Sequence, residues 1–187
     1  MKGYHNLPEQ TAETFVELDG KRWFKTGDIG QVDSRGRVSI TDRKKDLVKT
    51  SGGKYIAPGA IESHFKSISK ITSFLVIEAG DRNFVSALIA IDIDAGPAWA
   101  KQMGIPGDYS ELVKNPLLIE HVRSDLAALN KTLNKWETVK KFAVLPADLT
   151  VESGELTPSL KIKRKVVGER YKDVIDAMYK GTGGTDV

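Results

Sequence analysis

Four cations stand within five positions of the stretch GELTPSLKIKRKVV, residues 154–167: Lys161, Lys163, Arg164 and Lys165. A Gly and a Pro mark a turn just before them, and a helical pattern begins among them. A basic run is usually a solvated surface, yet cations at a helix N-terminus oppose the helix dipole by about 0.3–1 kcal/mol each, a cost that a function could explain. A lysine on a turn can also be presented into a neighbouring cleft. A solvated face, a phosphate-binding patch and one lysine with a chemical task therefore all remain open.

Two further stretches carry groups that suit a nucleotide. In TGDIG, residues 26–30, Asp28 either caps a turn or accepts hydrogen bonds from a ribose diol. In DRKKDLVKTSGGK, residues 42–54, Arg43 offers a planar fork to phosphate or ribose oxygens, and Gly52 and Gly53 permit close approach of backbone N–H groups. The competing interpretation of the second stretch is a solvated hairpin with a Gly-Gly turn.

Composition narrows the class of protein. The chain has 187 residues, 40% of them hydrophobic, and a net charge of +3, which is too small to argue for nucleic-acid binding. There is no Cys, and the three His lack metal-ligand spacing, so we expect no metal site. The N-terminal residues lack the apolar segment of a signal peptide, and the longest apolar runs are too short to span a bilayer. A cytoplasmic protein is the default expectation.

The elements that must position these residues begin with a β-rich region over 1–42. Its apolar and polar residues alternate around the turn Asp33-Ser34-Arg35-Gly36, which predicts a β-hairpin. Because one hairpin is too small to bury its own core, we interpret this region as the tail of a larger body.

From residue 43 the pattern changes to mixed helices and strands. Asn115 and Pro116 suit the first turn of one helix, and Gly168 weakens the last one. The order of elements predicts a compact α+β domain with a frayed tail over 181–187. Pro58 suits the start of a helix over 58–68, in which Ile61, Phe65 and Ile68 have helical spacing. The other expected elements are two short strands around Gly52 and Gly53, a hairpin over 71–92, a short helix from 95 that is ended by Gly104 and Pro106, a helix over 115–133, a strand over 139–146, a loop over 148–159 and a terminal helix over 161–180.

Taken in order, GYHNLPEQTAETF, WFKTGDIG, DRKKDLVKTSGGKYIAP and GELTPSLKIKR resemble the C-terminal motif series of adenylate-forming (AMP-binding) enzymes. The resemblance covers nearly the whole chain and is greatest to bacterial long-chain fatty-acid–CoA ligases. In that subgroup Leu-Thr-Pro-x-Leu-Lys stands where many relatives carry Ser/Thr-Gly-Lys, so the chain departs from the wider family at Leu160. The implied fold is the small α+β C-terminal domain, a short hairpin plus a three-stranded sheet packed with helices.

The resemblance also implies a domain organisation. Residues 1–42 would be the tail of a large N-terminal domain, 43–45 the hinge, with Lys45 at the pivot, and 46–187 a mobile C-terminal domain. The family's phosphate loop, its Mg²⁺-binding acid and its fatty-acyl tunnel belong to the N-terminal body. We therefore expect this chain to be inactive by itself.

The implied activity is a fatty-acid–CoA ligase that works in two half-reactions. A fatty acid reacts with ATP to give acyl-adenylate and pyrophosphate, and CoA then displaces AMP to give the thioester. Lys161 matches the lysine of the first half-reaction, while Asp28, Arg43 and, more loosely, Tyr55 match nucleotide-binding residues. The face for thioester formation and CoA would comprise Lys49, Ser51, Gly52 and Gly53. Lys163, Arg164 and Lys165 are left with screening or docking roles at most, and Lys140 and Lys141 are interpreted as a solvated strand edge in preference to a contact for CoA phosphates.

The implied ligands are ATP, Mg²⁺ held mainly by the N-terminal domain, CoA as co-substrate and a fatty acid. The implied protein partner is the N-terminal domain; nucleic acid is not expected, and peripheral membrane contact of a cytoplasmic full-length enzyme is left open. Two alternatives stay open: a fatty acyl-AMP ligase that passes the acyl group to a carrier protein, and a non-enzymatic basic module that binds a protein or nucleic acid.

Overall fold

The structure is a computed structural model that describes residues 1–187. The chain divides into two compact units, Met1–Leu47 and Val48–Val187. Each unit is described by itself.

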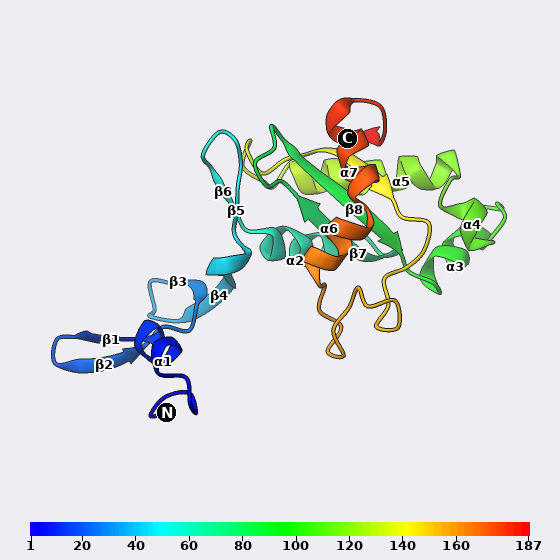
Figure 1. Cartoon of the computed structure of the whole chain (residues 1–187). Helices are drawn as coiled ribbons and strands as arrows, with labels where there is room; N and C mark the ends of the chain where they lie inside the picture. The colour runs from blue at the N-terminus through cyan, green and yellow to red at the C-terminus, as the bar shows by residue number, and fades with distance from the viewer. The chain divides into compact units, whose positions relative to one another are not determined.

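The first unit consists of two β-hairpins and two short helices (Figure 1). The second hairpin is the one that the sequence predicts: the Asp33 carboxylate accepts hydrogen bonds from the N–H groups of Arg35 and Arg37, both at 2.9 Å, and closes the turn. The helix over Pro8–Thr14 was not expected, because this region was interpreted as strands and turns. The elements are α1 Pro8–Thr14, β1 Phe15–Leu18, β2 Lys21–Phe24, β3 Asp28–Val32, β4 Val38–Arg43 and the 3₁₀ helix η1 Lys44–Asp46.

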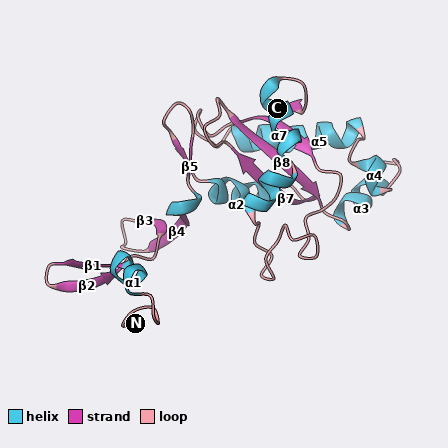
Figure 2. Ribbon diagram, viewed as in Figure 1, coloured by secondary structure: helices cyan, strands magenta, loops and turns pink.

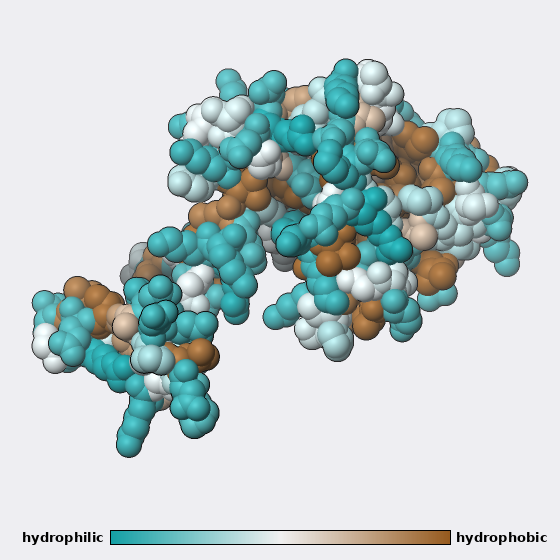
Figure 3. All heavy atoms as spheres, in the orientation of Figure 1, coloured by the Kyte–Doolittle hydropathy of each residue, from teal (hydrophilic) through white to brown (hydrophobic).

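The first unit has no fully buried residue, as expected of hairpins that are too small to form a core. Hydrophobic side chains lie on its surface instead, and Figure 3 shows hydrophobic atoms among the hydrophilic ones there. They include Trp23, Phe24, Val32, Val38 and Ile40.

The second unit is built on a four-stranded sheet in the order β10-β9-β8-β7. Strands β7 (Thr72–Glu78) and β8 (Val85–Ile91) form an antiparallel hairpin, β9 (Val139–Val144) runs parallel to β8, and β10 (Thr185–Asp186) pairs antiparallel with β9. All seven residues of β8 are buried, because both faces of this central strand are covered. Its other elements are β5 Val48–Lys49, β6 Tyr55–Ile56, α2 Pro58–Ile68, α3 Ala95–Gln102, α4 Tyr109–Leu112, α5 Pro116–Asn130, α6 Arg164–Arg170 and α7 Lys172–Lys180.

The sheet is the middle layer between two groups of helices (Figure 2). Alternate residues of a strand point to opposite faces, and the two hydrophobic clusters follow this alternation. Leu75 and Ile77 of β7 pack with α2 and α5, whereas Val76 between them packs with Val167 of α6 and Met178 of α7. The predicted α+β arrangement is therefore observed, with the helices distributed over both faces.

Local signals explain why two of the helices begin where they do. Pro58 occupies the first turn of α2, and Asn115 caps α5, where its side-chain oxygen accepts the N–H of Leu117 at 2.9 Å. Both were predicted.

Three details of the second unit differ from prediction. The terminal helix begins at Arg164, whereas it was expected from residue 161, and it is interrupted at Tyr171, which gives α6 and α7. The expected frayed tail forms β10, because Val187 donates its N–H to the carbonyl of Lys140 and Asp186 pairs with Lys141. The one-turn helix α4 was not expected; its cap is Asp108, whose carboxylate accepts the N–H groups of Ser110 and Glu111.

Candidate functional site

Lys161 lies at the tip of a short hairpin formed by residues 155–163, named here the Lys161 hairpin. Leu156 and Ile162 form an antiparallel bridge, and the N–H of Lys163 donates to the carbonyl of Glu155 at 2.8 Å. At the tip, Thr157 holds the main chain of Lys161 on both sides: its N–H donates to the Lys161 carbonyl at 2.8 Å, and its Oγ1 accepts the Lys161 N–H at 3.0 Å. The lysine thus has a defined backbone position.

The turn at this tip places Leu160 in the left-handed region, with φ at +57°. A turn followed by a residue in this conformation is a common hairpin ending that favours glycine, which is the residue that many relatives of the resembled family carry there. The side chain of Leu160 is 64% exposed, so no core contact explains the leucine. The side chain of Lys161 is exposed and takes part in none of the ion pairs, so its ammonium is available to a ligand.

Arg164 has a different role from the lysines beside it. Its guanidinium forms two parallel bonds to the carboxylate of Glu62 in α2, at 2.7 and 2.5 Å, and Glu62 Oε1 also accepts the N–H of Ile77 at 2.9 Å. Glu62 is buried, so this pair holds α6 against α2 and β7. The expectation that Arg164 has at most a screening or docking role is wrong. Lys163 and Lys165 remain exposed, and Lys165 lies only within 3.9 Å of Glu169.

Asp28 and Arg43 are brought together in the first unit. They are directly opposite each other at the ends of β3 and β4, and Arg43 Nε lies 3.2 Å from Asp28 Oδ1. Because both side chains are partly exposed, such a pair adds little stability. The hydroxyls of a ligand could compete for Asp28, and its phosphate oxygens could compete for Arg43.

A surface hollow of 510 Å³ adjoins this pair. Its lining includes Arg43 and Lys45, which were predicted to bind nucleotide and to form the hinge. Thr26 and Lys44 were not singled out from the sequence, although Thr26 begins the TGD turn and its Oγ1 accepts the N–H of Asp28 at 3.1 Å. The hollow is lined by Thr26, Gly27, Arg43, Lys44 and Lys45.

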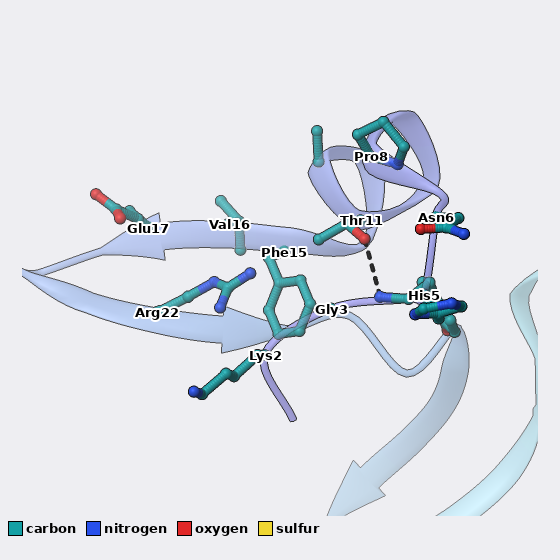
Figure 4. A pocket seen from close by; sticks show the side chains of 12 residues that line it. Lys2, Gly3, His5, Asn6, Pro8, Thr11, Phe15, Val16, Glu17 and Arg22 are labelled. Carbon is teal, nitrogen blue, oxygen red and sulfur yellow. Dashed lines mark hydrogen bonds between the residues drawn. The ribbon is translucent and has the colours of Figure 1, made fainter.

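A larger hollow of 750 Å³ lies between α1 and β1 and contains none of the predicted site residues (Figure 4). There the N–H of Tyr4 donates to Thr11 Oγ1 at 2.9 Å, and the Arg22 guanidinium stacks on Phe15 at 3.7 Å. Size alone does not make a site. The smaller hollow is the better candidate for a ligand site, because Lys44 and Lys45 lie there beside the ion pair of Asp28 and Arg43.

The β5–β6 hairpin carries the residues predicted to face CoA. Gly53 has φ of +76° and therefore requires glycine. The Ser51 hydroxyl donates to the carbonyl of Arg82 at 3.1 Å, so it is already used to dock the hairpin on the turn after β7. Tyr55 is 62% exposed, and its ring centroid lies 6.0 Å from Lys49 Nζ, which leaves an aromatic face and a cation on the outer side. Gly52 is exposed at the turn.

The Lys161 hairpin and the β5–β6 hairpin belong to the same unit. In Figure 1 the β5–β6 hairpin and the loop between β9 and α6 project from different sides of it. The structure therefore does not bring Lys161 together with Lys49, Ser51, Gly52, Gly53 or Tyr55.

Lys140 is exposed, whereas Lys141 forms an ion pair with Asp186 at 3.2 Å. The edge of β9 is therefore not solvated along its length, because β10 covers part of it. The structure contains no cluster of three or more His, Asp or Glu side chains that could hold a metal ion. None of its helices has the length and apolar character needed to cross a bilayer.

Known proteins resemble this chain over almost its whole length. It is 38% identical over 180 residues to the long-chain-fatty-acid–CoA ligase FadD15 of Mycobacterium tuberculosis, covering 95% of this chain and 29% of the ligase. It is 35% identical over 181 residues to the mouse long-chain-fatty-acid–CoA ligase 5, covering 96% of this chain and 26% of that protein. The chain thus spans less than a third of these relatives.

Solved structures confirm the fold. The A domain of the carboxylic acid reductase from Segniliparus rugosus, solved with AMP and a carboxylic acid, superposes with a TM-score of 0.74 at 21% identity, over 96% of this chain and 26% of that one. The family model of the AMP-binding enzyme C-terminal domain matches residues 45–183. The chain therefore belongs to the family of AMP-binding enzyme C-terminal domains, as its motif series indicated.

Proposed function

We propose that this chain is the C-terminal part of a long-chain fatty-acid–CoA ligase and that Lys161 acts in the formation of acyl-adenylate. The names of its relatives support the substrate class. The observation that carries the role of Lys161 is an exposed, unpaired ammonium on a hairpin whose backbone is held by Thr157.

In the first half-reaction an oxygen of the fatty-acid carboxylate attacks the α-phosphorus of ATP, and the bond to the bridging oxygen of pyrophosphate breaks. Two anions must approach, and their repulsion is costly where water is excluded. The ammonium of Lys161 would lie between them and stabilise the charge that develops on the α-phosphate oxygens. Asp28 would accept hydrogen bonds from the ribose hydroxyls, and Arg43 would contact ribose or phosphate.

In the second half-reaction the sulfur of CoA attacks the acyl carbonyl carbon, and AMP leaves with the electrons of the mixed-anhydride bond. The face with Lys49, Ser51, Gly52 and Gly53 would line the approach of CoA, and Tyr55 would stack near the nucleotide. Because the two hairpins project from different sides of one unit, both cannot face one reaction centre at once. We propose that the unit reorients between the steps about residues 43–45, with Lys45 as the pivot; its position in η1, next to the division between the compact units, supports this.

The proposal extends to the ligands and partners of the whole enzyme. Mg²⁺ would be bound by the preceding large domain, with which this chain would share ATP and CoA. Residues 1–42 would be the tail of that domain and 46–187 the mobile one. A cytoplasmic enzyme with peripheral membrane contact at its lipid substrate fits this chemistry.

The test is Lys161→Ala in the full-length protein, with palmitate as the carboxylate. Pyrophosphate release with ATP should fall by about 10²–10³-fold, the usual loss when one positioned charge donor is removed. Thioester formation from CoA and supplied palmitoyl-adenylate should be unchanged. Lys165→Ala is the matched control, because this lysine lies in the same basic run and is exposed.

Equal loss of both half-reactions in Lys161→Ala would refute the assignment. Thioester formation with a carrier protein but not with CoA would instead support an acyl-AMP ligase.

A further inference from the structure

Glu155 is a buried carboxylate at the base of the Lys161 hairpin. The residue is 1% exposed, and its carboxylate accepts hydrogen bonds from the hydroxyls of Ser153 at 2.6 Å and Tyr171 at 2.9 Å. Arg170 Nη1 lies 3.1 Å from the same oxygen that Tyr171 contacts. A buried charge is tolerated only when it is paired and hydrogen-bonded, and Glu155 meets this requirement with groups from the junction of α6 and α7.

The environment keeps this carboxylate ionised near neutral pH. Burial by itself raises the pKa of Glu155, but the hydrogen bonds from Ser153 and Tyr171 and the charge of Arg170 outweigh burial and hold the pKa below its ordinary value. The pKa of the Tyr171 hydroxyl is raised to about 12, mainly by burial and further by its hydrogen bond to Glu155. Tyr171 therefore remains a donor throughout the neutral range.

Glu155 is connected to Lys161 through two successive backbone contacts. The N–H of Lys163 donates to the carbonyl of Glu155, and the N–H of Thr157 donates to the carbonyl of Lys161. An isolated two-stranded hairpin is marginal in water, and the left-handed conformation of Leu160 at its tip is unfavourable for a residue other than glycine. The hairpin therefore needs an external anchor, and the Glu155 carboxylate supplies one.

We propose that Glu155 is a positioning residue for Lys161: it ties the base of the Lys161 hairpin to the α6–α7 junction through Tyr171 and Arg170. The hairpin is then already ordered before Lys161 meets the substrates. This inference rests on the proposed function of Lys161. Tyr171 lies at the interruption between α6 and α7, and from this position its hydroxyl donates to Glu155.

Two variants of the full-length protein test the anchor, Glu155→Gln and the milder Tyr171→Phe. Tyr179→Phe is the matched control: Tyr179 is also a half-buried tyrosine of the α7 region, but its hydroxyl bonds to the carbonyls of Glu78 and Phe84. The first measurement is amide hydrogen exchange over residues 156–162. The second is the rate of palmitoyl-adenylate formation, separated into kcat and KM for ATP, beside thioester formation from supplied palmitoyl-adenylate.

We expect Glu155→Gln and Tyr171→Phe to speed exchange in the hairpin and to lower kcat for adenylate formation by about 10–100-fold, as expected for a displaced reacting group. KM for ATP and thioester formation should change little. Tyr179→Phe should leave both the exchange in the hairpin and kcat unchanged.

The proposal would be overturned if hydrogen exchange in the hairpin were unchanged in both Glu155→Gln and Tyr171→Phe. It would also be overturned if both variants formed adenylate at the wild-type rate while Lys161→Ala did not. Equal losses in Tyr171→Phe and Tyr179→Phe would indicate general destabilisation and would overturn it as well. If Lys161→Ala itself has no effect, the proposed function fails, and with it the catalytic purpose of the anchor. Hydrogen exchange then still decides whether Glu155 holds the hairpin.

Discussion

Replacing Arg164 with Met should destabilise the second unit far more than the same change at Lys165. Arg164 makes two bonds, at 2.7 and 2.5 Å, to the carboxylate of Glu62, whose side chain is 10% exposed. Methionine retains the apolar stem and the helix propensity but removes the charge. Glu62 then keeps the N–H of Ile77 but has lost its guanidinium partner.

The expected cost follows from the burial of the pair. Removing one partner of a buried ion pair costs about 3–5 kcal/mol, because the other charge is left uncompensated. The side chain of Arg164 is 28% exposed, so water can partly replace it and the lower limit, about 3 kcal/mol, applies. For a unit of this size each kcal/mol lowers Tm by about 2–4 °C, which gives a fall of about 6–12 °C.

The measurement is urea and thermal unfolding of the 187-residue chain, followed by circular dichroism, for the wild type, Arg164→Met and Lys165→Met. Lys165→Met should lie within about 0.5 kcal/mol of the wild type, because its side chain is 88% exposed. A double variant with Glu62→Gln should lose less than the sum of the single losses, since each change removes the same pair. Equal, small effects of Arg164→Met and Lys165→Met would show that the pair does not hold α6 in place.

Two more predictions concern single residues of the second unit. Burial raises the pKa of Glu78 to about 7, with the charge of Glu62 adding to it and Arg164 and Arg82 opposing it. Between pH 4.5 and 7 the folded state therefore holds a proton that the unfolded state has released, so stability falls as pH rises through this window, by at most about 3 kcal/mol. Glu78→Gln should remove most of this slope in urea unfolding and be more stable than the wild type at pH 8; identical slopes would contradict this. Leu160→Gly should relieve the left-handed strain at φ +57° and raise the free energy of unfolding by up to about 1 kcal/mol, after allowance for the greater freedom of glycine in the unfolded chain, whereas Leu160→Val should lower it; a loss in both variants would show that the conformation is not strained.

Several elements could be predicted from the sequence because their signals are local. Pro58 and the spacing of Ile61 and Phe65 predict α2, and Asn115 predicts the start of α5. The turn from Asp33 to Gly36 predicts the β3–β4 hairpin for the same reason: the side chain that closes the turn lies within it.

Other elements could not be predicted, because their stabilising partners are far away in the chain. The glycine-rich segment before β10 has little strand propensity. Strand β10 is stabilised by distant partners: Lys141 pairs with Asp186, the carbonyl of Lys140 accepts the N–H of Val187, and Arg123 donates to the carbonyl of Asp186 at 3.0 Å. The contact of Tyr171, at the helix break, is likewise distant in the sequence: its hydroxyl donates to Glu155, which lies in the loop before α6.

The sequence by itself determined the family of this chain and the residue types available to a site, because the order and spacing of the motifs can be recognised without a structure. It also identified Lys161 as the lysine that matches the family motif. Only the tertiary structure decided the roles of the neighbouring cations. The partner of Arg164 is Glu62, 102 residues earlier, and no local sequence pattern predicts that pair. The buried carboxylate of Glu62 needs a cationic partner, because an unpaired buried charge is strongly destabilising. Arg164 is therefore structural, whereas Lys163 and Lys165 are exposed to water and have no such role.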